Sequence, residues 1–502
     1  MRILSKSKLM AWRQCPKRLW LEVYHPGLRE DSTTSEAAFS VGHQVGDIAR
    51  QLYDRKGNGV LIDPQVEGFD AAFARTRALL QSAQPVFEAG FRAEGALAFA
   101  DVMLPKKRGG NLAWRMVEVK SSTSVKDYHH DDAAIQAFVA QSAGAVLQSI
   151  ALAHIDSDWV YPGNGDYAGL LQEHELTEEA FARADEVRGW ITEAQQVLAQ
   201  PAMPDIACGR QCDQPYACGF HDWCQSQQPQ PDQPIDWLPG KLGGELQAQI
   251  EACGWTELRD VPDELLTQKQ QRVKSVTVSG MTYFDQAGAV DVLSPYKLPA
   301  YFLDFETIQF AVPIWKGTRP YQQIPFQFSL HRLSRTGKLE QQAFLDLSGD
   351  DPSRAFAETL IDMCGERGPI FVYSAAFETS RIRDLAERFP RLRKSLLVLN
   401  DRVVDLLPVA REHYYHPSQH GSWSIKKVLP AVCPDLDYQQ LDGVQDGGMA
   451  MEAFLEAIAP QTSETRKAEI EQQLLAYCAL DTYAMVRLWA YFTGSTLDIE
   501  HG

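Results

Sequence analysis

A Gln- and Pro-rich stretch, QSQQPQPDQPIDWLPG at 225–240, divides the 502-residue chain into two parts. It has no periodic apolar pattern, so it predicts a linker. On both sides of it, apolar segments of strand character alternate with segments of helical periodicity. Each part is therefore expected to be an α/β domain. We expect domains at 1–224 and 299–502, with the linker and a small helical segment at 225–298.

The composition is that of a soluble protein, with 45% hydrophobic and 23% charged residues. The formal net charge of −18 argues against a protein that coats polyanions in general. It leaves room for local basic patches, which occur at 6–18, 105–111 and 380–394. No apolar run is long enough to cross a bilayer, and the N-terminus has no signal-peptide core. We expect a cytoplasmic protein that does not bind a membrane.

The first part is predicted to be a mixed sheet with helices. A turn centred near Arg108–Gly109, in PKKRGGN at 105–111, would pair two strands and set Asp101 opposite Met116. Glu118 and Lys120 would then share a face with Asp101, because strand side chains alternate. The predicted strands are 85–91, 95–104, 112–121 and 145–155, and the predicted helices are 8–23, 37–53, 131–144 and 177–200.

Two carboxylates and an ammonium on one face form a candidate active site. Carboxylate oxygens suit Mg²⁺ or Mn²⁺, and the lysine can orient water or stabilise charge on a phosphate. The E-x-K tripeptide alone is common and more often marks an exposed ion pair. Asp101 at hairpin spacing favours a site, as does Gln136 on the next helix, one turn after Asp132.

Asp101, Glu118-Val-Lys120 and Gln136 resemble the motif of the RecB-like branch of PD-(D/E)XK nucleases. The resemblance implies a mixed sheet flanked by helices and metal-dependent phosphodiester cleavage. It assigns Asp101, Glu118, Lys120 and Gln136 to catalysis, and Asp101 and Glu118 to the metal. Two positions depart from the pattern. Gly46 stands where a histidine is common, with His43 one turn earlier, and Ala140 replaces a tyrosine.

Five of the nine cysteines are Cys15 and four others close together, in CGRQCDQPYACGFHDWC at 208–224. A reducing compartment disfavours disulfides, so clustered cysteines indicate a metal. Zinc and iron–sulfur centres both use four thiolates. Zinc ribbons usually have two C-x₂-C hooks, which are missing here, and His221 is a further possible ligand. Cys253, Cys364, Cys433 and Cys478 are expected in the core.

The positions of Cys15, Cys212, Cys218 and Cys224 resemble those of RecB-like nucleases with a [4Fe–4S] cluster, such as AddB-type nuclease domains and CRISPR-adaptation exonucleases. The resemblance implies a cluster that staples the first helix to the end of the domain. Cys208 would be a spare or would replace Cys212. Zinc stays open as the alternative metal.

A second group of carboxylates lies in the C-terminal part. Asp304 and Glu306 are two residues apart on an apolar strand, and Tyr477 and Asp481 are four apart on a helix, so each pair shares a face. Glu378 follows another strand. Carboxylates that converge at strand ends suit two-metal phosphoryl transfer.

In this order, FLDFET, SAAFE and YCALD resemble DnaQ-like 3′–5′ exonucleases, which have an RNase H-like fold. The resemblance implies Mg²⁺ or Mn²⁺ on Asp304, Glu306, Glu378 and Asp481, with Tyr477 orienting the attacking water. Ser374 replaces the usual Asn and Glu378 the usual Asp. Asp405 is a candidate fourth carboxylate, and Lys426 or Lys427 a candidate phosphate contact. The order of the two halves also resembles an uncharacterised bacterial family.

The leading hypothesis is a DNA nuclease with two active sites, acting on single-stranded or end-bearing DNA in repair, processing or defence. The first alternative is a nucleic-acid-binding or scaffold protein whose RecB-like site has decayed, as Gly46 and Ala140 suggest. The second alternative is a C-terminal RNA exonuclease, because contacts to a 2′-hydroxyl leave no mark in the sequence. Protein partners are not indicated.

Overall fold

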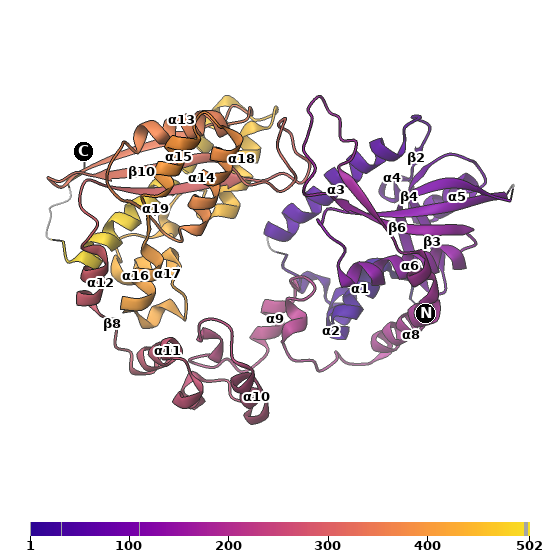
Figure 1. Cartoon of the computed structure of the whole chain (residues 1–502). Coiled ribbons are helices and arrows are strands. Elements are labelled where there is room, and N and C mark those ends of the chain that lie inside the picture. The colour runs from indigo at the N-terminus through magenta and orange to yellow at the C-terminus, as the bar shows by residue number, and fades with distance from the viewer. Residues whose placement is uncertain (1, 32, 110, 496–499, 502) are drawn as a thin grey trace. The chain divides into compact units, whose positions relative to one another are not determined.

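A computed structural model describes residues 2–31, 33–109, 111–495 and 500–501 (Figure 1). The chain forms two compact units. The first unit comprises Met1–Pro229 and Phe310–Gln322, and the second comprises Gln230–Gln309 and Gln323–Gly502. Both are mixed α/β structures, as expected, but the expected boundaries did not include the return of 310–322 to the first unit. None of the described helices is long and apolar enough to cross a membrane.

A seven-stranded mixed sheet forms the centre of the first unit, in the order β2-β3-β4-β5-β6-β7, with β1 parallel to β4. β3, β4 and β5 are antiparallel neighbours, and β5 and β6 are parallel. The predicted strands are all present. Their bounds are β1 Leu4–Ser5, β2 Val60–Leu61, β3 Val86–Ala93, β4 Ala96–Arg108, β5 Asn111–Lys120, β6 Leu147–Ile155 and β7 Leu171–Glu175.

The β4–β5 hairpin differs from the predicted one. The strands pair as far as Arg108 and Asn111, so the turn is shorter than 105–111, and Gly109 supports it with a φ of 58°. Val102 pairs with Val117, so the register sets Asp101 opposite Glu118, and the predicted partner Met116 is wrong. The error is two residues. Because the side-chain period is also two, Asp101 and Glu118 still share a face.

Helices cover both faces of this sheet. α3 packs on the face that holds Val102 and Val117, and α6 packs on the face that holds Met103 and Met116. The predicted helix 8–23 is interrupted at Cys15, whose backbone is extended because Pro16 follows it. The helices are α1 Lys6–Gln14, α2 Pro16–Tyr24, η1 Pro26–Leu28, α3 Thr33–Tyr53, α4 Pro64–Glu67, α5 Phe69–Leu79, α6 Asp127–Ser142, α7 Thr177–Ala182, α8 Ala184–Ala199, η2 Arg210–Cys212 and α9 His221–Ser226.

A six-stranded mixed sheet, in the order β13-β12-β9-β10-β11-β15, forms the centre of the second unit. β9 lies inside the sheet, parallel to β12 and antiparallel to β10, and the long helix α19 packs against β9 and β10. The strands are β9 Ala300–Ile308, β10 Ile324–Leu333, β11 Lys338–Leu345, β12 Ile370–Val372, β13 Val403–Asp405 and β15 Glu500–His501; β8 Tyr283–Phe284 and β14 Tyr414–Tyr415 form a separate pair.

The segment between the expected domains is folded. Ile235 and Leu238, from the expected linker, are buried in a small core with Leu246, Leu258 and Val261. This apolar burial anchors the second half of the Gln/Pro-rich stretch to the second unit. The helices of this unit are η3 Ile235–Trp237, α10 Gly244–Cys253, η4 Leu258–Asp260, η5 Asp263–Leu265, α11 Gln268–Ser279, α12 Gln286–Leu293, α13 Ser353–Met363, α14 Ala376–Arg388, α15 Arg393–Asn400, α16 Leu406–His413, η6 Pro417–Gln419, α17 Ile425–Val432, η7 Tyr438–Gln440, α18 Gly447–Ile458 and α19 Glu464–Thr493.

Candidate active sites and metal centres

The first candidate site, here called the Glu118 pocket, lies at the end of β5. Asp101 on β4, Glu118 and Lys120 on β5 and Lys6 on α1 line it. The Asp101 carboxylate accepts a hydrogen bond from the Val119 backbone N–H at 2.6 Å, which fixes its orientation. The predicted group Asp101, Glu118 and Lys120 is therefore brought together.

Two buried carboxylates, Glu118 in the lining of this pocket and Asp132 on α6, are paired with the Lys6 and Lys120 ammonium groups. Glu118, only 1% exposed at its side chain, accepts hydrogen bonds from Lys120 at 2.7 Å and from Lys6 at 2.8 Å, and it also accepts one from the Gln136 amide. Asp132 on α6 contacts Lys120 at 2.5 Å and Lys6 at 2.9 Å. Gln136 thus contacts Glu118 directly, as a hydrogen-bond donor.

Burial and neighbouring charges shift the pKa values of the acids at this pocket. Burial and the neighbouring Glu118 carboxylate raise the pKa of Asp101 well above its usual range, and the same two causes raise the pKa of Glu88. Burial opposes ionisation of Asp132 too, but the Lys120 and Lys6 ammonium groups outweigh it and lower the pKa of Asp132. The site therefore carries more acid than its lysines neutralise, which favours a divalent cation.

Lys6 and Glu88 were not predicted for this pocket. Glu88 belongs to β3 but has no paired residue in β4, because the pairing passes from Phe87 to Ala89. Its φ of 54° shows that the strand is irregular at this residue. Lys6 is 112 residues from Glu118 in the chain, so no local pattern could connect them. Among the residues that departed from the resemblance, His43 and Gly46 line the pocket, and Ala140 is buried in the core.

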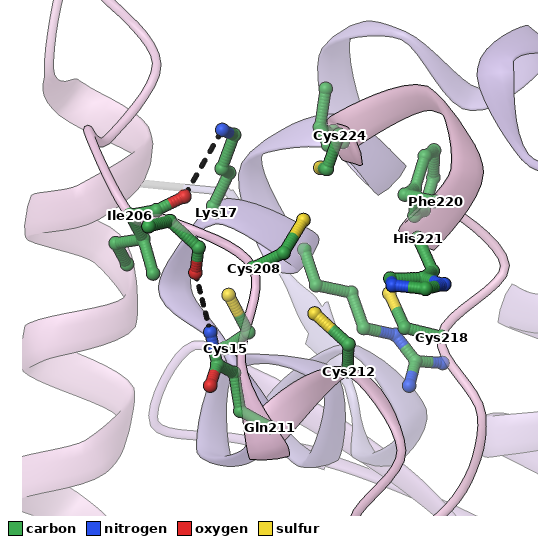
Figure 2. Close-up of a pocket in the computed structure, with 13 residues that line it drawn as sticks. Cys15, Lys17, Ile206, Cys208, Gln211, Cys212, Cys218, Phe220, His221 and Cys224 are labelled. Atoms are coloured by element: carbon green, nitrogen blue, oxygen red, sulfur yellow. Dashed lines mark hydrogen bonds between the residues drawn. The ribbon is translucent and has the colours of Figure 1, made fainter. Parts of the chain in front are cut away.

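The second candidate site is a cavity lined by cysteines. Cys15, Cys208, Cys212, Cys218 and Cys224 surround it together with His221 (Figure 2). Cys15 lies at the break between α1 and α2, and the Gln14 amide binds the backbone carbonyls of Gln211 at 2.7 Å and Tyr216 at 2.8 Å. The distant N-terminal cysteine is thus held beside the other four.

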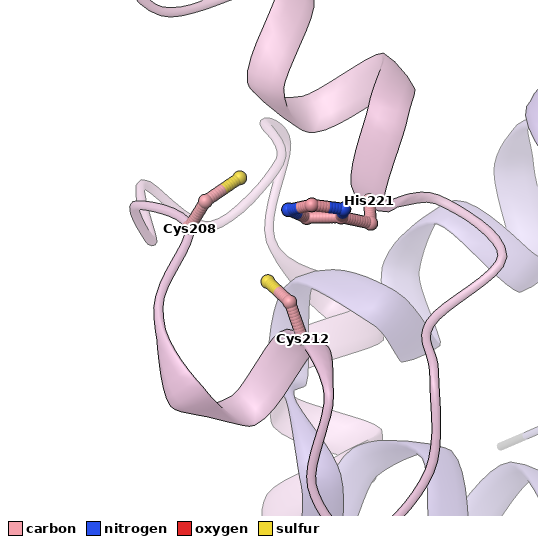
Figure 3. Close-up of side chains that lie close together, drawn as sticks. All are labelled: Cys208, Cys212 and His221. Carbon is pink, nitrogen blue, oxygen red and sulfur yellow. The ribbon is translucent and has the colours of Figure 1, made fainter. Parts of the chain in front are cut away.

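Cys208, expected as a spare, lies close to Cys212 and His221. One ligand atom from each of the three lies within 4.8 Å of the others (Figure 3). Burial, followed by the nearby Cys212 and Cys224, raises the pKa of Cys208 to about 11. Five thiols and an imidazole form a soft donor set that fits an iron–sulfur cluster or zinc. Lys17 and Arg18 also line the cavity and can offset the charge of thiolates.

The third candidate site, here called the Asp304 cluster, lies in the second unit. Asp304 and Glu306 on β9 and Asp481 on α19 each place a carboxylate oxygen within 4.8 Å of the other two. No salt bridge in the described part of the chain involves any of the three. Glu378, on the first turn of α14, is 2% exposed, and its Oε2 has no hydrogen-bond partner there.

Burial raises the pKa values of these acids, and repulsion from neighbouring carboxylates of the cluster adds to it at Asp304 and Glu306. Burial and the neighbouring Asp481 raise the pKa of Glu306 to about 8, and they raise that of Asp304 well above its usual range. Burial raises the pKa of Glu378 to about 8 and that of Asp481 to about 6. Buried oxygen donors that form no salt bridge within the described residues fit Mg²⁺ or Mn²⁺, which would replace the protons.

Two tyrosines and a lysine lie beside these acids. Tyr438 donates a hydrogen bond to Asp481 at 2.6 Å, a contact that the sequence did not indicate. The Lys426 ammonium lies 5.2 Å from the ring centre of Tyr477 and 5.3 Å from that of Tyr438. Lys426 also donates to the Gln445 carbonyl at 3.0 Å. Lys426 thus lies beside these tyrosines, and the contact with a phosphate expected for it or for Lys427 stays a prediction.

Asp405, the candidate fourth carboxylate, stabilises the local backbone. It accepts hydrogen bonds from the backbone N–H groups of Ser374 at 2.9 Å, Ala375 at 3.0 Å and Leu407 at 2.9 Å. These contacts cap α16 and hold the turn before α14. Ser374 has a φ of 78°, which is uncommon outside glycine, so the turn that positions Glu378 is conformationally demanding.

The chain is similar to a described family and to a curated protein. Residues 301–424, which include Asp304, Glu306 and Glu378, match a domain of unknown function, DUF2779. The "Uncharacterized protein MG366 homolog" of Mycoplasma pneumoniae (strain ATCC 29342 / M129 / Subtype 1) is 26% identical over 206 residues. That alignment covers 37% of this chain and 31% of the relative, so the chain spans about a third of the length of the curated relative it matches. Neither description names an activity.

Proposed function

We propose that the chain is a metal-dependent nuclease that hydrolyses phosphodiester bonds in DNA at two sites. The observation that carries this proposal is the Asp304 cluster. Asp304, Glu306 and Asp481 bring three carboxylates together without a neutralising salt bridge in the described residues, and Glu378 adds a buried unpartnered oxygen. Such a cluster is costly to keep unless it binds cations.

In the second unit, the proposed reaction is 3′–5′ exonucleolytic cleavage. Asp304, Glu306, Glu378 and Asp481 would hold Mg²⁺ or Mn²⁺, which supplies Lewis-acid stabilisation of the phosphate when bound. Tyr477 would orient the attacking water, and the nearby Lys426 would neutralise charge on the phosphate. Tyr438 holds the Asp481 carboxylate in place.

In the first unit, Asp101 and Glu118 would hold the metal and Lys120 would act on the reacting phosphate or water. Gln136 orients Glu118 through its amide. We further propose that Cys15, Cys212, Cys218 and Cys224 hold a [4Fe–4S] cluster with a structural role, because the cluster would join Cys15, near the start of the chain, to the segment 212–224.

The test is a cleavage assay of anaerobically purified protein on end-labelled single- and double-stranded DNA and RNA, with and without Mn²⁺. Cleavage of DNA from the 3′ end is expected. Asp481→Ala should lower the rate by at least about a hundredfold, because it removes a metal ligand. Tyr477→Phe should cost about tenfold, because it removes only the water-positioning hydroxyl. No metal-stimulated cleavage of any substrate would refute the proposal.

One observation favours a second candidate, a nucleic-acid-binding protein with one active exonuclease site. Lys6 and Lys120 already neutralise Glu118 and Asp132, which would suit a first unit that binds DNA without cutting it. Under that alternative, Glu118→Ala would leave every cleavage activity unchanged.

A further inference from the structure

Lys6 occupies an unusual position in the Glu118 pocket. It begins helix α1, and its ammonium lies 2.8 Å from Glu118 Oε1 and 2.9 Å from Asp132 Oδ1. A divalent cation held by Asp101 and Glu118 would have to share Glu118 with this ammonium. We propose that Lys6 is an intrinsic competitor for the metal, which sets the divalent-cation affinity of the pocket; this rests on the proposed metal site there.

The acids around the pocket outnumber the lysines that contact them. Three of them line the pocket from β3, β4 and β5, and a fourth, on α6, contacts both the Lys6 and Lys120 ammonium groups. Arg50 and His43 line the pocket from α3, but Arg50 is already paired with Asp47. The four acids are Glu88 on β3, Asp101 on β4, Glu118 on β5 and Asp132 on α6.

The exposures show which partner can move. The Lys6 side chain is 22% exposed, whereas that of Glu118 is 1% exposed. Lys6 is a flexible chain with a path to solvent, and it can release Glu118 while it keeps Asp132. Glu118 is fixed by Gln136 and the strand. Metal entry should therefore displace Lys6 from Glu118.

The test measures Mn²⁺ binding by calorimetry at pH 8 on full-length protein in which Asp304→Ala and Glu306→Ala silence the second unit. Lys6→Met should tighten Mn²⁺ binding at least about tenfold, because a repelling unit charge beside the ion is removed. Lys6→Arg should stay near the reference affinity. Lys8→Met removes the same charge from the same helix at a residue outside the pocket, and it should change little. Glu118→Gln should abolish binding.

An unchanged or weaker Mn²⁺ affinity in Lys6→Met would overturn the proposal, as would an equal gain in Lys8→Met. If Mn²⁺ binds only after Lys6→Met, Lys6 excludes the metal, and the proposed catalytic role of the first unit fails while the role of Lys6 stands. If Mn²⁺ binds neither protein, both proposals fail. If Lys6 only stabilised α1, Lys6→Met would loosen that helix and weaken Mn²⁺ binding. This change is opposite to the tighter binding that the proposal predicts.

Discussion

Glu306 illustrates how burial turns an ordinary side chain into a functional one. Its strand position makes it 8% exposed, and the Asp481 carboxylate lies beside it. Without metal, the side chain keeps a proton until about pH 8, so Mg²⁺ or Mn²⁺ must displace protons to bind. Metal affinity at this cluster should consequently rise with pH through the neutral range.

The same shift predicts how the stability of the metal-free protein depends on pH. The pKa of Glu306 is about 8 in the folded protein and near 4.5 in an unfolded chain. The folded state therefore binds more protons between these values, and the stabilisation from the protonated side chain is lost as the pH rises towards 8. In EDTA, the stability of Glu306→Gln relative to the unmodified protein should rise by about 2–3 kcal/mol between pH 6 and 8.5, as measured by urea unfolding.

The control for this measurement is Glu452→Gln, which changes an exposed carboxyl on α18. Its stability relative to the unmodified protein should not depend on pH in this range. A pH-independent difference for Glu306→Gln would mean that the carboxyl is ionised in the folded, metal-free state. In excess Mg²⁺ the order should reverse, because Glu306→Gln loses a metal ligand.

At the scale of elements, β3, β4, β5 and β6 were predictable from the sequence because their apolar, β-branched runs are long and sharply bounded, whereas β7, β10 and β11 were not predicted. The β4–β5 register was not, because the strands continue through Pro105, Lys106 and Lys107, whose turn-like composition hid the pairing. Asp101, Glu118 and Lys120 were still placed together, since a two-residue error preserves the face. Lys6, Glu88 and Tyr438 escaped prediction because only the tertiary fold brings them to their sites.

The break between α1 and α2 gives the cysteine cavity its most distant member. Pro16 ends the helix at Cys15, and this leaves the cysteine in an extended backbone beside η2 and α9. The cavity thus joins the start of the first unit to its end. A bound metal would close that long loop and stabilise the unit.

Cysteine substitutions distinguish the two metals. If the centre is a [4Fe–4S] cluster, anaerobically purified protein should be brown, with about four iron and four sulfide per chain. Cys15→Ala and Cys218→Ala should then each remove the colour, and Cys208→Ala should not. A zinc site on Cys208, Cys212 and His221 would give the opposite result: zinc would survive Cys15→Ala and be lost in His221→Ala. Metal analysis of the purified variants checks both.

For the whole molecule, a net charge of −18 means that nucleic acid must be held by local positive surface. Lys106 and Lys107 are exposed near the tip of the β4–β5 hairpin. If they contact phosphates, Lys106→Glu with Lys107→Glu should lower the slope of log affinity against log salt by about 1.5. Fluorescence anisotropy with single-stranded DNA in EDTA measures it. As a control, Lys56→Glu with Lys297→Glu, at two other exposed residues, should leave the slope unaltered. An equal decrease of the slope in both double variants would indicate general repulsion of the DNA by added negative charge.

The division into two units predicts that the two proposed activities are separable within the intact chain. Each unit has its own sheet, its own core and its own carboxylates, although the chain passes between the units three times, at 229–230, 309–310 and 322–323. Because of these crossings, the test needs point variants of the full chain and cannot rely on fragments.

Asp304→Ala with Glu306→Ala should abolish 3′–5′ cleavage and leave the activity of the first unit, while Glu118→Ala should do the reverse, since each change removes metal ligands from one site alone. The protein with both sets of changes should still bind DNA and cut nothing. Thermal unfolding of each variant in EDTA controls for loss of the fold. If Asp304→Ala with Glu306→Ala eliminated all cleavage, the first unit would be a binding module, as in the second candidate function.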